Sequence, residues 1–66
     1  MKFDQFDTVI LLKDHFNEGI IKGEIGTIME IYINPREAYE VEFVDENGQA
    51  KALLTLSPNE LEKYNI

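Results

Sequence analysis

The chain has 66 residues, 13 acidic and 6 basic side chains, a net charge of −7 and no cysteine. This length suits one domain, residues 1–66, with one small core, and the lack of thiols excludes disulfides and thiolate metal sites. The negative charge opposes binding to phosphate backbones and favours basic partners. No apolar run approaches the ~20 residues of a membrane span, and no signal-peptide core is present, so we expect a cytoplasmic protein.

The first third of the chain predicts one strand and a long loop. Residues 6–12 form a β-branched, apolar run typical of a strand, without clean alternation, so we expect part of it to be covered on both faces. Residues 13–21 form a polar loop. We expect its Phe16 and Ile20 side chains to fold back over one end of the core.

Two glycines lead into the second strand, which runs from about residue 26 to residue 33. Gly23 and Gly26 predict a sharp turn back into the sheet, because glycine adopts positive φ at no steric cost. Pro35 ends the strand, since proline cannot donate a hydrogen bond to a ladder.

Residues 39–43 predict the third strand, with apolar and acidic side chains in strict alternation. Asn47 and Gly48 favour a type I′ hairpin turn, which would place Glu46 opposite Gln49. Counting outward from that turn puts six apolar residues on one face, as a core requires. The predicted pairs are Phe43 with Ala52, Val41 with Leu54, and Tyr39 with Leu56.

The C-terminal residues predict one helical turn and a last short strand. Ser57 suits an N-cap, Pro58 the first helical position and Glu60 the capping-box position. Residues 61–64 can form the last strand. Five short strands with one 3₁₀ or helical turn before the last describe a small all-β, SH3-like barrel, and a partly open OB-type barrel is the alternative.

No group of residues predicts catalysis or a cofactor, so we expect a non-enzymatic protein without cofactor or metal. His15 is the only histidine and has no paired nucleophile. Asp14, His15 and Glu18 could be drawn as a metal cluster, but their spacing matches no calcium or zinc loop, and solvated loop charges are the simpler interpretation. The loop around Lys22 lacks the cations that an RNA-binding barrel needs, which disfavours a nucleic acid partner.

The outer face of the middle strands is the candidate interaction surface. We expect Glu30 to lie near Glu42 and Tyr32 near Glu40, while the hairpin register places Glu42 opposite Leu53, Glu40 opposite Thr55 and Val44 opposite Lys51. Apolar side chains inside a charged rim are typical of interfaces, although an ordinary solvated sheet face is the alternative. The candidate partner-binding residues are Glu30, Tyr32, Glu40, Glu42, Val44 and Leu53.

Four blocks of the sequence resemble one family of short bacterial proteins: residues 6–12, 22–28, 38–45 and 53–56. The chain resembles the family catalogued as domain of unknown function 4926 over nearly its whole length. The resemblance implies an SH3-like barrel with no assigned activity and no catalytic residues. The gene arrangement of such families suggests a toxin–antitoxin or immunity-type pairing.

These observations lead to three hypotheses about function. The first is a non-enzymatic protein-binding module that docks its acidic face on a basic protein, such as an antitoxin masking the cationic groove of a nuclease. The second is an accessory barrel that packs on an enzyme or on another copy of itself through apolar contacts at Phe16, Ile20 or Val44, so a homo-oligomer remains an alternative. The third, less favoured, is an RNA-binding barrel.

Overall fold

The computed structural model describes residues 1–65 as five antiparallel strands and two single-turn 3₁₀ helices. The strands are β1 (Thr8–Leu11), β2 (Ile25–Tyr32), β3 (Ala38–Val44), β4 (Ala50–Leu56) and β5 (Leu61–Lys63). The 3₁₀ helices are η1 (Phe16–Glu18) and η2 (Pro58–Glu60). The predicted all-β fold, with a 3₁₀ turn before the last strand, is confirmed.

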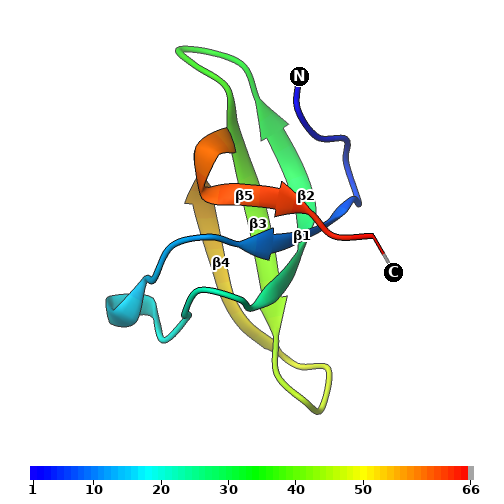
Figure 1. Cartoon of the computed structure of the whole chain (residues 1–66). Coiled ribbons are helices and arrows are strands. Elements are labelled where there is room, and N and C mark those ends of the chain that lie inside the picture. Colours follow the sequence, from blue (N-terminus) through cyan, green and yellow to red (C-terminus); the bar gives the residue numbers. More distant parts are fainter. Residues whose placement is uncertain (66) are drawn as a thin grey trace.

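All five strands belong to one sheet, in the order β4-β3-β2-β1-β5. Figure 1 shows β2, β3 and β4 running side by side, while β1 and β5 cross them at a steep angle. This arrangement is compatible with the expected SH3-like barrel. None of the helices in residues 1–65 has the length and apolar character needed to cross a membrane.

The core lies between the crossing strands and is built by alternation. Tyr39, Val41 and Phe43 of β3 all point inward and are fully buried. β1 also alternates, with Val9 and Leu11 buried on the inner face and Thr8 and Ile10 half-buried on the other face. The buried residues are Phe3, Val9, Leu11, Ile20, Ile28, Tyr39, Val41, Phe43, Leu56 and Leu61.

β1 is shorter than the predicted strand over residues 6–12. Phe6 has a φ of 70°, a left-handed conformation that interrupts the extended chain before Thr8. Its N–H still donates to the Ile28 carbonyl at 2.7 Å, so the backbone stays attached to β2 although the phenyl ring is exposed. A bulky residue with positive φ could not be foreseen from an apolar run.

The loop after β1 places only one of its two expected apolar side chains in the core. Ile20 is fully buried, as predicted, whereas Phe16 is 74% exposed, so the prediction for Phe16 is wrong. The reason is η1, which spans Phe16–Glu18 and is followed by Gly19 in the left-handed conformation. The turn is closed by a bridge between His15 and Ile20, which points Ile20 inward and leaves Phe16 outside.

Gly23 and Gly26 have different structural roles. Gly23 has a φ of 97° and makes the predicted turn. Gly26 does not have positive φ, so that part of the prediction is wrong: it lies buried in β2, opposite Phe43. A Cβ at Gly26 would stand 2.6 Å from Val41 Cγ1, so this glycine allows β2 and the β3 side chains to pack closely.

The β3–β4 hairpin turns one residue earlier than predicted. The Gly48 N–H donates to the Asp45 carbonyl at 2.9 Å, and of the turn residues Gly48 alone has positive φ. This is a type I turn at Glu46 and Asn47 followed by a glycine bulge, not a type I′ turn. The Asp45 carboxylate accepts the N–H groups of Asn47 at 2.8 Å and Gln49 at 3.0 Å, which stabilises this turn type.

The register of the hairpin is nevertheless as predicted beyond the turn. The earlier turn brings Val44 opposite Ala50 instead of Lys51, and a bulge then shifts the ladder by one residue. The one-residue shift from the earlier turn and the one-residue shift from the bulge cancel, so the pairs beyond the bulge are the predicted ones. The confirmed pairs are Phe43 with Ala52, Glu42 with Leu53, Val41 with Leu54, Glu40 with Thr55, and Tyr39 with Leu56.

The N-terminal segment closes one end of the core, a role that the sequence did not reveal. Phe3 is 2% exposed, and its ring packs edge-on against Tyr39, with 5.1 Å between ring centroids. The Tyr39 hydroxyl accepts the N–H groups of Lys2 and Phe3, both at 3.1 Å, and donates to the Glu37 carboxylate. The buried Tyr39 hydroxyl therefore has hydrogen-bond partners for both its oxygen and its proton.

Candidate functional site

The six predicted partner-binding residues share the outer face of β2, β3 and β4. Their neighbours along each strand point into the core, because side chains alternate between the two faces of a sheet. We call this surface the acidic face; it consists of Glu30, Tyr32, Glu40, Glu42, Val44 and Leu53. All six are exposed or half-buried.

The pairing between β2 and β3 differs from the prediction by two residues. Glu30 lies opposite Glu40 rather than opposite Glu42, which pairs with Thr27. A bulge at Met29, between the Ile28 and Glu30 pairs, shifts the ladder by a further residue, so that Glu30 and Glu40 share the outer face. An offset of two residues keeps each side chain on its face, so the acidic cluster forms on the predicted surface with a different pairing.

Tyr32 reaches Glu40 diagonally, although its partner in the ladder is Ala38. The Tyr32 hydroxyl donates to Glu40 Oε1 at 2.9 Å, so the predicted proximity of these two residues is confirmed. This hydrogen bond to a carboxylate, then desolvation and the charges of Glu40 and Glu30, raise the pKa of Tyr32 above its ordinary value of 10.0. The phenol therefore stays a neutral donor that holds the carboxylate in place.

Two aliphatic side chains lie beside the carboxylates. Leu53 is opposite Glu42 and is 56% exposed, and Val44, two residues along β3, is 47% exposed. Lys51 does not face Val44. Its ammonium instead makes an ion pair with Glu24 at 2.7 Å.

Within residues 1–65, the acidic face has no cation of its own. Among the described residues, the three ion pairs are His15–Glu60, Lys51–Glu24 and Lys63–Asp7. Within residues 1–65, no basic side chain comes within 4.0 Å of the carboxylates of Glu30, Glu40 or Glu42. A group of carboxylates without counter-charges attracts cationic ligands.

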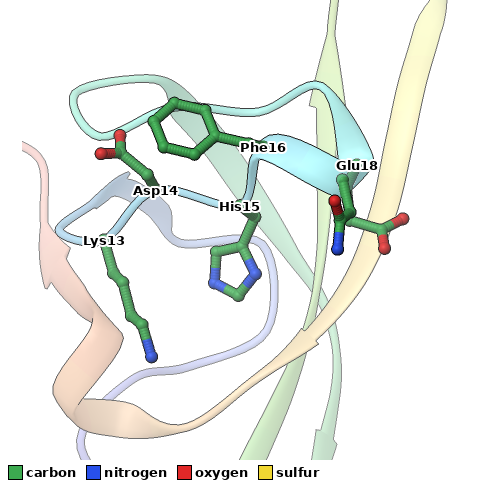
Figure 2. Close-up of a pocket in the computed structure, with 6 residues that line it drawn as sticks. Lys13, Asp14, His15, Phe16 and Glu18 are labelled. Carbon is green, nitrogen blue, oxygen red and sulfur yellow. The ribbon is translucent and has the colours of Figure 1, made fainter.

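The loop around η1 carries a separate hollow of about 330 Å³, lined by residues 13–18. Figure 2 shows the His15 and Phe16 rings on opposite sides of this loop. His15 Nε2 lies 2.8 Å from Glu60 Oε1, so the histidine links the loop to η2. Across residues 1–65, no three histidine, aspartate or glutamate side chains converge as metal donors, so Asp14, His15 and Glu18 do not form a metal cluster.

A family model for a domain of unknown function (DUF4926) matches residues 5–63. This chain belongs to the DUF4926 family. No curated protein and no solved structure matches the chain. The match covers every strand of the DUF4926 fold and all six residues of the acidic face, so the candidate surface lies within the family domain.

Proposed function

We propose that this DUF4926 protein is a non-enzymatic binding module that docks a basic protein on its acidic face. The observation that carries the proposal is the grouping of Glu30, Glu40 and Glu42 without a cation within 4.0 Å among residues 1–65. Like charges directly opposite each other, as at Glu30 and Glu40, destabilise a sheet. A cationic partner would relieve that repulsion on binding.

The uncharged members of the acidic face support a protein partner. Tyr32, Val44 and Leu53 are 41%, 47% and 56% exposed, and they stand among the carboxylates. Interfaces commonly place aromatic and aliphatic side chains within a polar rim, and tyrosine is enriched there. The face thus offers apolar contact as well as charge.

The concrete form of the proposal is an antitoxin or immunity-type partner. The carboxylates would occupy a cationic groove in place of the phosphates of a nucleic acid. The net charge of −7 would speed the encounter, because complementary fields steer association. Binding of this kind weakens steeply as ionic strength rises.

The test is a comparison of three tagged baits in a lysate of the bacterium that encodes the chain. The baits are the wild type, Glu40→Lys with Glu42→Lys, and Glu18→Lys with Glu46→Lys. Both double variants have a net charge of −3, since each exchange adds two positive units to −7. Glu18 and Glu46 are exposed and lie outside the acidic face, so the third bait controls for overall charge.

We expect a basic protein to bind the wild type and the control bait at low salt and to elute at high salt. The association rate measured with the purified partner should fall at least about tenfold in the Glu40/Glu42 variant. Equal capture by all three baits would refute the acidic face. Salt-insensitive recovery of the chain alone would instead favour the accessory or self-associating barrel, and a mobility shift with RNA at low salt would favour the RNA-binding barrel.

A further inference from the structure

Among residues 1–65, β4 is an edge of the sheet, with β3 on one side and no strand paired on the other. The strand order ends at β4, and Figure 1 shows no further strand beside it. Within residues 1–65, the backbone groups of Ala50–Leu56 make no hydrogen bond to any segment other than β3. Every second N–H and C=O group along seven residues is therefore free to pair with another chain.

The two edges of the sheet differ in how they are protected. β5 has three residues, and Glu62 and Lys63 supply charges, which is typical of an edge that resists pairing. β4 has seven residues without proline or a carboxylate. Its single cation, Lys51, is engaged by Glu24 at 2.7 Å, so the stretch from Ala52 to Leu56 lacks any protecting charge.

We propose that β4 is the docking edge of this module: an extended, cationic segment of the partner adds to it as a sixth strand. This inference rests on the proposed function and specifies its binding mode. In such additions the main-chain hydrogen bonds supply affinity and the alternate side chains supply specificity.

Charge complementarity selects a cationic strand. A strand beside β4 would lie two strand spacings, roughly 10 Å, from Glu40 and Glu42 on β3. Between them stand only Leu53 and Thr55, the β4 partners of those carboxylates. Arginine and lysine side chains on alternate positions could lay their aliphatic stems over Leu53 and place their charged ends at the carboxylates.

A second copy of the chain is the less suitable occupant. It would satisfy the same backbone groups, but it would bring two proteins of net charge −7 together. It would also place the carboxylates of two acidic faces on one continuous sheet. A basic strand would form hydrogen bonds with the free backbone groups of β4 and would also neutralise the carboxylates of the acidic face.

The test uses the full chain labelled with ¹⁵N and a seven-residue probe peptide of alternating arginine and valine, capped at both ends. Two further peptides have the same sequence with N-methyl groups on alternate backbone amides, in opposite phases. Only one phase removes the N–H groups that face β4, because successive residues of a strand donate to opposite sides. Binding is followed by titration, and amide hydrogen exchange is measured along β4.

We expect the unmethylated peptide and one methylated peptide to bind, and the other methylated peptide to bind at least tenfold more weakly. Every second amide of β4 should gain protection from exchange on binding. The Glu40→Lys, Glu42→Lys variant should bind the unmethylated peptide at least tenfold more weakly, and the Glu18→Lys, Glu46→Lys variant should bind it like the wild type.

Equal binding of both methylated peptides, without protection in β4, would overturn strand addition. If the Glu40/Glu42 variant nevertheless failed to bind these peptides, the result would still support the acidic face as a binding surface. No binding of the unmethylated peptide would also overturn strand addition, and the pull-down would then decide the proposed function separately. Protection of β4 that grows with protein concentration alone would identify a second copy as the occupant and overturn the cationic strand.

Discussion

Gly26 marks the closest contact between β2 and the core side chains of β3. A Cβ built there would meet Val41 Cγ1 at 2.6 Å, Phe43 Cε1 at 2.9 Å and the Glu42 carbonyl oxygen at 3.1 Å. The first two distances are too short for any real Cβ, and the third involves backbone. Both side chains are fully buried, so neither can swing into solvent.

We therefore expect Gly26→Ala to lower the free energy of unfolding by about 1–3 kcal/mol, the usual cost of overpacking a core. The measurement is urea denaturation at neutral pH. Val41→Ala removes the nearest clashing atom, so the Gly26→Ala, Val41→Ala double variant should lose less stability than the sum of the two single variants. Additive losses would show that the two sites do not touch.

At the scale of elements, Glu60 joins the η2 turn to the segment that follows β1. Glu60 Oε2 accepts the Ser57 N–H at 3.0 Å, as in the predicted capping box, and it also accepts the Ser57 hydroxyl at 2.9 Å. Glu60 Oε1 lies 2.8 Å from His15 Nε2 in the loop after β1, and the Glu60 carbonyl accepts the Leu12 N–H at 2.8 Å. The turn before β5 is thereby fixed to the end of β1.

These contacts make the stability depend on pH. Burial acts to raise the pKa of Glu60, but the hydrogen bonds from Ser57 and His15 outweigh it and hold the pKa below the ordinary value of 4.5. A carboxyl whose pKa is lowered by folding stabilises the protein above its unfolded value. That contribution is lost as the pH falls through the lower, folded value.

Glu60→Gln should reduce the free energy of unfolding by about 1 kcal/mol at neutral pH, because a charge-assisted hydrogen bond becomes a neutral one. The difference from the wild type should shrink as the pH falls below 4.5, where Glu60 of the wild type also becomes neutral. Glu62→Gln is the control, since Glu62 is exposed on β5 and should show little effect at any pH. A difference that does not change with pH would contradict the assigned role of the carboxylate.

A strand or helical turn could be predicted from the sequence where a short local pattern of residues determines it. Alternation identified β3, and the capping residues identified η2. The hairpin register was predicted correctly despite the wrong turn type, because Phe43 and the half-buried Ala52 must both face the core. The Asp45 side chain favours the observed turn through its hydrogen bonds, but the Asn47-Gly48 pair led to the prediction of a type I′ turn instead.

Other features depend on contacts that sequence patterns do not contain. The bulge at Met29 sets the pairing of Glu30 with Glu40, and no local residue type announces it. Phe3 is held by Tyr39, 36 residues away, so its burial is a tertiary property. For the acidic face, alternation therefore predicted which residues share the surface, whereas the observed neighbours required the structure.

At the scale of the whole molecule, negative charge exceeds what internal ion pairs neutralise. There are 13 acidic residues, and the three ion pairs found within residues 1–65 involve only Asp7, Glu24 and Glu60. The molecule measures 32 × 27 × 18 Å. The Debye length is about 30 Å at 0.01 M salt, so charges across the whole molecule interact at low ionic strength. At 1 M salt the Debye length is about 3 Å, and the charges are screened from one another.

Glu30→Gln should therefore stabilise the free protein, by about 0.5 kcal/mol at 0.01 M salt, because it removes the like charge opposite Glu40. The gain should vanish at 1 M salt, and thermal or urea unfolding at the two salt concentrations measures it. Glu18→Gln, on the exposed η1 turn, also changes the net charge from −7 to −6 and should give a smaller gain. The same Glu30 variant should bind a basic partner more weakly, because the repulsion that destabilises the free sheet is what the partner relieves. If the Glu30→Gln variant were no more stable at low salt and bound the partner as tightly as the wild type, the three carboxylates would be independent, solvated charges.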